Sequence, residues 1–277
     1  MIRVDAVGMA EAVRVRRLSD QSEASDNAAG DSPNPRRLTN PANPADVGSI
    51  AGMRQVPAYV EADVGMASDH TTAAWAFDLD LWGRCGQGLD ENSALAALSV
   101  EIGHQVQPTV VERIIGDEQA FHRDEQPATE AERTATLAIL TAARRDTLML
   151  VASNPPEVLD FDDPTRLLPA FANWRTLRQM AWHLADTESR YYLPCLGLPA
   201  RPAEPDLLTE LTASAQHVHA TVSTMPADLI RRDDGQTWTT TKVLRRLAWH
   251  ERSELTTMHR LAGRARTILQ TDPRLTH

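Results

Sequence analysis

The segment Trp238-Thr-Thr-Thr-Lys-Val-Leu-Arg-Arg-Leu-Ala-Trp-His-Glu-Arg-Ser-Glu254 carries the clearest helical pattern in this chain. Thr239 or Thr240 can cap the start of a helix, because a threonine hydroxyl accepts hydrogen bonds from the free amides of the first turn. Apolar residues then recur at helical spacing, at Val243, Leu247, Met258 and Leu261. This period predicts one long amphipathic helix over about 239–268.

Three polar residues fall inside or beside the apolar face of this helix, at about 100° of rotation per residue. They are His250, Glu251 and Glu254. Burying an imidazole and a carboxylate costs free energy unless a partner satisfies them. A metal ion would satisfy both, and so would hydrogen bonds to protein groups in a cavity or at a subunit contact. Both interpretations fit this helix alone.

The segment 174–192 has the same helical period and predicts a second helix over about 173–193, which Pro194 ends. His183 lies at the edge of its apolar face, and Thr187 follows one turn later. Residues at i and i+4 are neighbours on a helix surface. His250 and Glu254 can therefore hold one ion together with a third ligand from a facing helix, and His183 is the candidate for that ligand.

Two more helices are predicted in the same part of the chain. Glu130–Ser153 carries an apolar stripe that includes Arg144, and Asn154-Pro-Pro follows it. A further helix spans about 206–224. Four helices predict an all-α bundle over about 130–268, and the cores of such bundles are where metal sites are built from facing helices.

These segments resemble the DinB-like family of metal-binding four-helix bundles. The resemblance is carried by Met180-Ala-Trp-His-Leu-Ala-Asp-Thr-Glu with Tyr191-Tyr-Leu, by Trp238-Thr with Lys242-Val-Leu, and by Trp249-His-Glu-Arg. It implies a divalent metal ion (Zn, Ni, Fe or Mn) bound by His183, His250 and Glu254. Glu254 stands where the family usually has histidine. Two histidines and one carboxylate suit metals with open coordination positions, although the change can equally mean weakened or lost binding.

Members of that family include thiol-dependent transferases and isomerases. The resemblance therefore implies a small-molecule substrate with a low-molecular-weight thiol as co-substrate, and hydrolase chemistry is an alternative. An ion with open positions lowers the pKa of a bound water or thiol, or polarises a carbonyl. Glu251 and Asp186 are candidate catalytic residues, because either could orient a ligand or act as a base.

The other histidines near these helices fit different roles. The stretch from His250 to Glu254 lacks the second histidine of the zinc-protease motif His-Glu-x-x-His. His259 lies nine residues after His250, about half a turn out of phase, so we expect it at the surface or the helix end. His217 and His219 are two residues apart and cannot share a helical face, so we expect both to be structural or exposed.

Residues 55–120 predict a small α/β domain ahead of the bundle, which makes the predicted fold class α+β. Ala58-Tyr-Val-Glu-Ala-Asp-Val and Thr72-Ala-Ala-Trp-Ala-Phe-Asp are typical of strands. A Gly-rich stretch from Leu81 follows, with a short strand or tight turn, and then a helix that Asp90 can cap. No Gly-Lys-Ser/Thr follows the glycines, so they do not form a phosphate-binding loop.

This order of elements resembles the HicB-like antitoxin domain over about fifty residues. Gly83, Cys85, Gly88 and Asp90-Glu91 carry the likeness loosely, and Trp82 stands in place of the usual proline. The resemblance implies a second functional class, a non-enzymatic regulatory or antitoxin-like binding protein whose bundle is a scaffold or a homodimer contact. A small α/β domain without an inherited role fits the same residues.

Composition narrows the class of protein. The 277 residues include 28 basic and 38 acidic side chains, a net charge of −10, which argues against nucleic-acid and anionic-membrane partners. No apolar run approaches the roughly 18 residues of a membrane span, and no apolar h-region follows Arg14, Arg16 and Arg17. Two cysteines, Cys85 and Cys195, predict no disulfide framework, so we expect a reducing cytoplasm. A single lysine among many arginines is typical of high-GC bacterial genomes.

Residues 1 to about 54 contain three Asn-Pro pairs and one Ser-Pro pair without a sustained apolar period. Such a segment cannot bury enough surface to offset the entropy of ordering it. We therefore expect it to be disordered, and a start codon assigned too early would explain part of it.

Limited proteolysis tests this expectation. A protease at low concentration should remove residues 1 to about 54 early and leave a stable fragment of the remainder, which mass spectrometry of the fragments would identify. First cuts inside the predicted bundle would contradict it.

Overall fold

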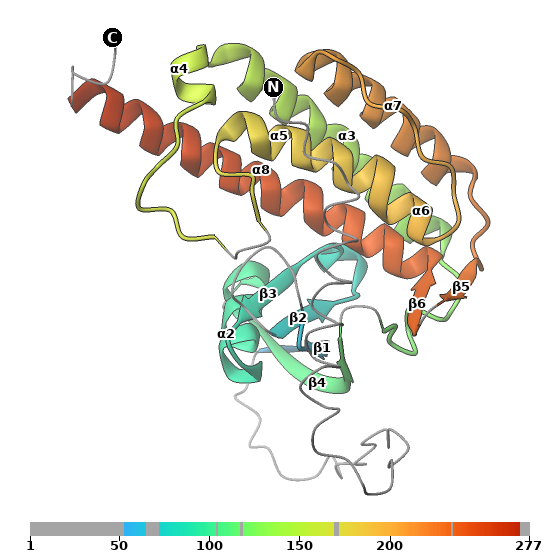
Figure 1. Ribbon diagram of the computed structural model, residues 1–277. Helices are drawn as coiled ribbons and strands as arrows, with labels where there is room; N and C mark the ends of the chain where they lie inside the picture. Colours follow the sequence, from blue (N-terminus) through green and yellow to red (C-terminus); the bar gives the residue numbers. More distant parts are fainter. Residues whose placement is uncertain are drawn as a thin grey trace, which may run out of the picture.

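The computed structural model describes residues 53–64, 72–103, 105–116, 119–168, 172–233 and 235–271. Within them, a four-stranded mixed sheet with one helix precedes a larger helical part (Figure 1). The predicted α+β fold class is therefore confirmed. The predicted disordered segment lies outside the described residues, apart from its last two positions.

The sheet has the strand order β3-β2-β1-β4. β1 (Arg54–Ala62) pairs antiparallel with β2 (Thr72–Ala76), and β2 pairs antiparallel with β3 (Cys85–Gly88). β4 (Val106–Ile115) pairs parallel with β1, after a crossover that contains α2 (Glu91–Ile102). The two predicted strands, the Gly-rich strand and the helix after it are confirmed.

The edge strand β4 was not predicted, and its sequence explains why. Its residues alternate between half-buried and exposed positions, so none of them is fully buried. It also contains Pro108, which cannot donate to a ladder and is tolerated at an edge. Pairing with β1, which lies about fifty residues earlier in the chain, therefore stabilises a strand whose own pattern is weak.

Gly86 and Gly88 allow α2 to pack closely on β3. A Cβ at Gly86 would lie 2.1 Å from the backbone nitrogen of Leu98, and one at Gly88 would lie 2.5 Å from that of Ala94. The glycines therefore serve the packing of the helix on the strand. Asp90 caps α2 as predicted, and its carboxylate accepts a 2.8 Å hydrogen bond from the amide of Ser93.

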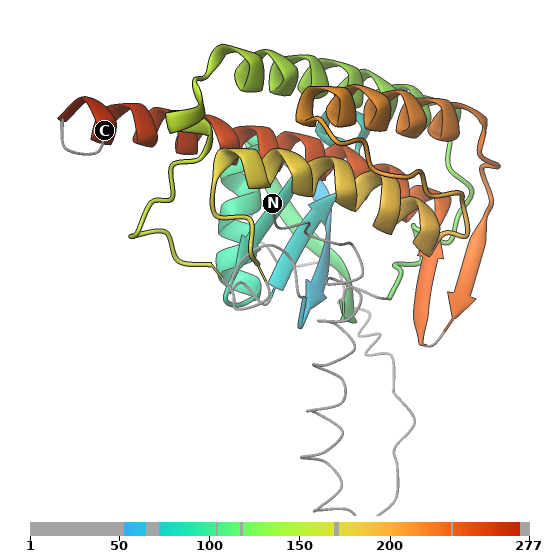
Figure 2. The same cartoon turned by 45° about the horizontal axis from the view of Figure 1, so that its top comes forward.

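Four long helical segments form the bundle, and they run alongside one another in both ribbon views (Figures 1 and 2). They are α3 (Glu130–Ser153), α5 (Leu177–Asp186) with the π-helical turn Thr187–Tyr192 and α6 (Leu193–Cys195), α7 (Leu207–Thr224), and α8 (Thr240–Thr271). α3 and α5 each contact both α7 and α8. The predicted helices match these bounds within a few residues.

Several shorter elements were not predicted, because each is too short to show a period. They are the turn Leu79–Leu81, α4 (Pro156–Leu159) and the hairpin of β5 (Ile230–Asp233) and β6 (Gln236–Thr239). β6 ends where α8 begins. The hairpin therefore leads the chain into α8.

The sheet packs against α8 and shares a hydrophobic core with it (Figure 1). Trp75 of β2 meets Trp249 of α8 edge to face, with ring centroids 5.6 Å apart. The loop at Gly83, where φ is +73°, comes so close that a Cβ there would lie 2.7 Å from the Cβ of Ala248. The predicted domains 55–120 and 130–268 are therefore in direct, close-packed contact.

Buried ion pairs reinforce this contact. Arg245 of α8 donates to Glu61 of β1 and to Asp124, each at 2.8 Å, and its guanidinium lies 4.3 Å from the Trp75 ring centroid. Arg246 donates to the second oxygen of Glu61 at 2.9 Å. Glu61, Arg245 and Asp124 are fully buried, so these charges depend on one another for satisfaction.

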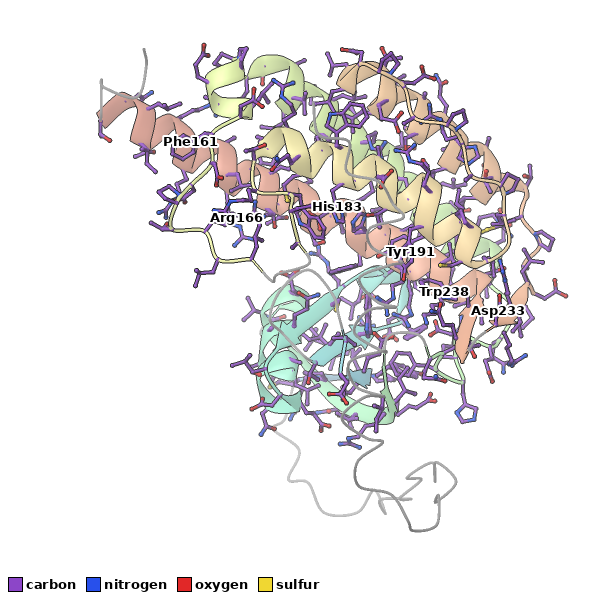
Figure 3. The ribbon with its side chains drawn as sticks, in the orientation of Figure 1. Phe161, Arg166, His183, Tyr191, Asp233 and Trp238 are labelled. Carbon is purple, nitrogen blue, oxygen red and sulfur yellow. The ribbon has the colours of Figure 1, made fainter. Side chains whose placement is uncertain are left out.

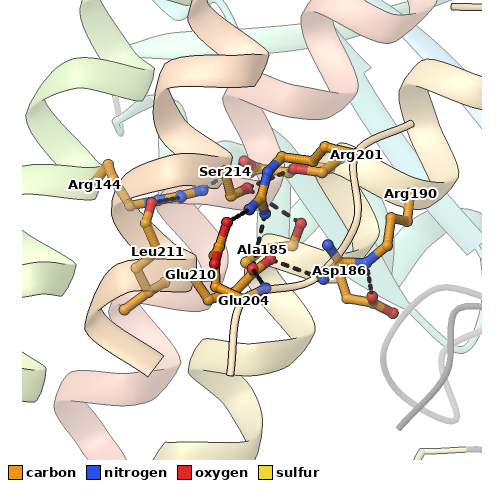
Figure 4. Close-up of polar contacts among 11 residues, drawn as sticks. Arg144, Ala185, Asp186, Arg190, Arg201, Glu204, Glu210, Leu211 and Ser214 are labelled. Atoms are coloured by element: carbon orange, nitrogen blue, oxygen red, sulfur yellow. Dashed lines mark hydrogen bonds and ion pairs between the residues drawn. The ribbon is translucent and has the colours of Figure 1, made fainter. Parts of the chain in front are cut away.

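A second buried network fixes the connection between α6 and α7 (Figure 4). Glu210 of α7 is fully buried and accepts hydrogen bonds from Arg190 at 2.9 Å and from Arg201 at 2.8 Å. It also accepts one from the amide of Glu204 at 2.7 Å. Arg190 pairs in addition with Asp186, one turn earlier on the same helical segment.

The composition predicted no disulfide framework and no membrane span. Cys85 and Cys195 are both free, Cys85 being buried and Cys195 partly buried. Among the described residues, no helix combines the length and the apolar character that crossing a membrane requires.

Replacing Glu61 with alanine should destabilise the protein by about 3–5 kcal/mol, because it leaves Arg245 and Arg246 buried without their shared carboxylate. Urea unfolding would measure the change. Glu101→Ala is the control, since Glu101 forms an ion pair with Arg84 in which both side chains are largely exposed. Equal stabilities of the two variants would contradict this account of the contact.

Candidate metal centre

Three buried side chains from two helices meet inside the bundle. His183 of α5, and His250 and Glu254 of α8, each offer one ligand atom, and these atoms all lie within 4.8 Å of one another. Nε2 of His250 lies 3.5 Å from Nε2 of His183 and 3.8 Å from Oε1 of Glu254. Figure 3 shows His183 where α5 passes over α8. The three predicted ligands therefore converge.

The spacing of these donors suits one ion. A tetrahedral ion that binds its ligands at about 2.0–2.2 Å holds them about 3.4 Å apart. The two measured distances from Nε2 of His250 are close to that value. The group can therefore hold a metal ion after only small side-chain movements.

Burial prepares the three groups to bind a cation. Burial, reinforced by the nearby His250, lowers the pKa of His183 well below its ordinary value. Burial, with a smaller effect of Arg144, lowers the pKa of His250 to about 3. Both imidazoles are therefore neutral at pH 7 and can offer a lone pair. Burial raises the pKa of Glu254 to about 7, so a nearby cation would favour its charged form.

Aromatic rings fix how the two histidines lie. Trp174 stacks on His183 with ring centroids 3.8 Å apart and an angle of 9° between the planes. Tyr192 meets His250 edge to face at 5.6 Å. Such contacts restrict the rotation of both imidazoles.

The other nitrogen of each imidazole has a partner of its own. Nδ1 of His183 lies 3.2 Å from the hydroxyl of Thr187, and Nδ1 of His250 lies 3.4 Å from Oε1 of Glu188. Thr187 and Glu188 are consecutive residues at the start of the π-helical turn. In both histidines, Nε2 therefore faces the other ligand and Nδ1 faces this turn.

Behind the histidines, Arg144 of α3 joins two buried carboxylates. Its guanidinium donates to Glu188 at 2.7 Å, to Glu251 at 2.9 Å and to the carbonyl of Leu211 at 2.8 Å. Burial raises the pKa of Glu188 and of Glu251, against the opposing effect of Arg144. The two carboxylates also raise the pKa of Arg144, so the guanidinium stays charged.

The sequence did not identify Glu188, and it identified Arg144 only as a member of an apolar stripe. A charged residue in such a stripe signals a buried partner, which Arg144 indeed has. Glu188 gave the same kind of signal, because it lies one turn after Leu184 on the apolar face of the predicted helix, but it was not singled out.

The remaining candidates lie in different places. Glu251, the residue after His250, accepts a hydrogen bond from Arg144. Asp186 pairs with Arg190, and Figure 4 shows the two side chains together. His259 is exposed on α8, as expected. His219 is exposed as well, and His217 is half-buried with its ring 2.9 Å from the carbonyl of Pro199.

Comparison of the chain with protein-family models, with curated proteins and with solved structures found no match in any of the three. The resemblances to the DinB-like and HicB-like families therefore stay predictions. The geometry of its own residues is therefore the evidence that this centre can bind a metal ion.

Proposed function

We propose that this protein is an enzyme that binds one divalent metal ion through His183, His250 and Glu254 and uses its open coordination positions. The observation that carries this proposal is the meeting of three buried donor atoms within 4.8 Å. Two neutral imidazoles and a carboxylate form a donor set that zinc, nickel, iron and manganese all accept. This donor set alone does not select one of these metals. The availability of each metal and its preferred coordination geometry decide which one binds.

The charges around the centre favour a cation. Three buried carboxylates, those of Glu188, Glu251 and Glu254, lie near two guanidinium groups, those of Arg144 and the half-buried Arg166. Burial raises the pKa of all three carboxylates, because their charged forms are not fully compensated by the protein. A divalent ion would stabilise the ionised carboxylates and reduce this cost.

Bound here, a divalent ion would lower the pKa of a water or thiol ligand, or polarise a carbonyl oxygen. The side chains of the protein would hold the ion and keep its ligands in place. His183, His250 and Glu254 would present the donor atoms, and the rings of Trp174 and Tyr192 would keep both imidazoles in place. The resemblance to the DinB-like family suggests a small-molecule substrate with a low-molecular-weight thiol, so we propose transferase or isomerase chemistry before hydrolysis.

Glu251 is better placed than Asp186 to serve this chemistry. It is fully buried, shares Arg144 with Glu188, and lies one residue after His250. Asp186 forms an ion pair with Arg190. We therefore propose that Glu251 supports the ligands electrostatically.

Metal content tests the proposal directly. His250→Ala should abolish stoichiometric metal binding while the helical fold remains, because helix packing does not depend on one ligand. Glu254→His should tighten binding, since it adds a third imidazole one turn after His250. Elemental mass spectrometry of purified proteins would measure both effects, and circular dichroism would verify the fold.

His259→Ala is the matched control on the same helix, because His259 is exposed. It should keep the metal content of the wild type. A wild-type protein without metal, together with no gain in Glu254→His, would refute the proposal and favour the non-enzymatic alternative.

Metal affinity should fall as the pH decreases below about 7. The proton that competes with the metal is the one on Glu254, whose pKa burial raises to about 7, and not one on His250, whose pKa is about 3. Calorimetric titration with Zn²⁺ between pH 5 and 8 would measure this. An affinity that stays constant over that range would contradict the role of Glu254 as a ligand.

A further inference from the structure

We infer that Thr187 and Glu188 are positioning residues, which orient the two histidines so that both Nε2 atoms point at one metal ion. This inference rests on the proposed metal site and adds to it the pair of residues that sets its affinity. The two side chains are almost completely buried, with 2% of Thr187 and 0% of Glu188 exposed.

The tautomer of each histidine decides which of its nitrogens can bind a metal ion. A neutral imidazole carries one proton, and the nitrogen without it supplies the lone pair that binds a metal. Oε1 of Glu188, 3.4 Å from Nδ1 of His250, can only accept a hydrogen bond when ionised. The Glu188 contact therefore places the proton of His250 on Nδ1 and leaves the lone pair on Nε2. The hydroxyl of Thr187, 3.2 Å from Nδ1 of His183, can accept from or donate to that nitrogen, so it is compatible with the same tautomer of His183.

Two consecutive positions on one helical segment supply both contacts. Thr187 follows His183 by four residues and therefore faces it, as in any α-helix. Glu188 follows Leu184 by four residues, and Leu184 is fully buried. Thr187 and Glu188 therefore both face the interior of the bundle, at the start of the π-helical turn.

Arg144 fixes the carboxylate of Glu188 in the required orientation. It donates to Oε2 at 2.7 Å, while Oε1 of the same carboxylate faces His250. Arg144 is itself held by Glu251 of α8 and by the carbonyl of Leu211 of α7. Three helices therefore determine where Glu188 lies, and through it the direction of the His250 ring.

The test measures the affinity for Co²⁺ by titration, together with the visible absorption of the bound ion, which reports the geometry of its ligands. Glu188→Ala should weaken binding by roughly 10- to 100-fold, the usual effect of losing such a partner. Glu188→Gln keeps an oxygen that can accept from Nδ1, so it should weaken binding less and preserve the absorption spectrum. It also guards against loss of fold in the alanine variant. Thr187→Val should weaken binding through His183.

Glu210→Gln is the matched control. Glu210 is equally buried and also binds arginines, at 2.9 and 2.8 Å, but those arginines are Arg190 and Arg201 of the network between α6 and α7. This variant should lose stability and keep the wild-type affinity for Co²⁺. Wild-type affinity in Glu188→Ala, or an equal loss in Glu188→Gln and Glu210→Gln, would overturn the positioning role alone. A wild-type protein that binds no Co²⁺ would overturn the metal site as well.

Discussion

Residues 240 to 251 of α8 are buried without interruption, although four of them carry formal charges. A helix buried on every side must find partners for its charges within the protein. Glu61 of the sheet pairs with Arg245 and Arg246, and Arg144 of α3 pairs with Glu251. This constraint joins the sheet to the bundle and brings the ligands of the candidate centre into the interior.

Much of this arrangement follows from local sequence. The i, i+4 relation of His250 and Glu254 and the helical period around His183, together with the resemblance to the DinB-like family, predicted that three ligands meet. The end of α3 was predicted because Pro155 and Pro156 follow it. The structure adds a capping box of Thr129 and Glu132 at its start. Where the apolar period is strong and the ends carry caps or prolines, the sequence alone defines the helix.

The remainder depends on contacts that no local pattern encodes. Glu188 meets His250 and Arg144, which lie 62 and 44 positions away in the sequence. The strand β4 depends on pairing with β1, far away in the sequence, because the alternation of its own apolar and polar residues is too weak to predict a strand. The pairing of Arg245 with Asp124 likewise joins residues 121 positions apart. Tertiary contacts of this kind override local preference.

The sheet also lies next to the candidate centre along α8. Trp249, which precedes His250, packs on Trp75 of the sheet. Neighbouring residues of one helix therefore make the contact with the sheet and contribute to the candidate centre.

X-ray absorption spectroscopy of the metal-loaded protein tests the central claim most directly, because it reports the atoms bound to the ion. With His183, His250 and Glu254 as ligands, we expect nitrogen and oxygen neighbours at about 2.0–2.2 Å, with the multiple-scattering signature of two imidazoles. Sulfur neighbours, or a shell without imidazole, would contradict the assignment of His183, His250 and Glu254 as ligands.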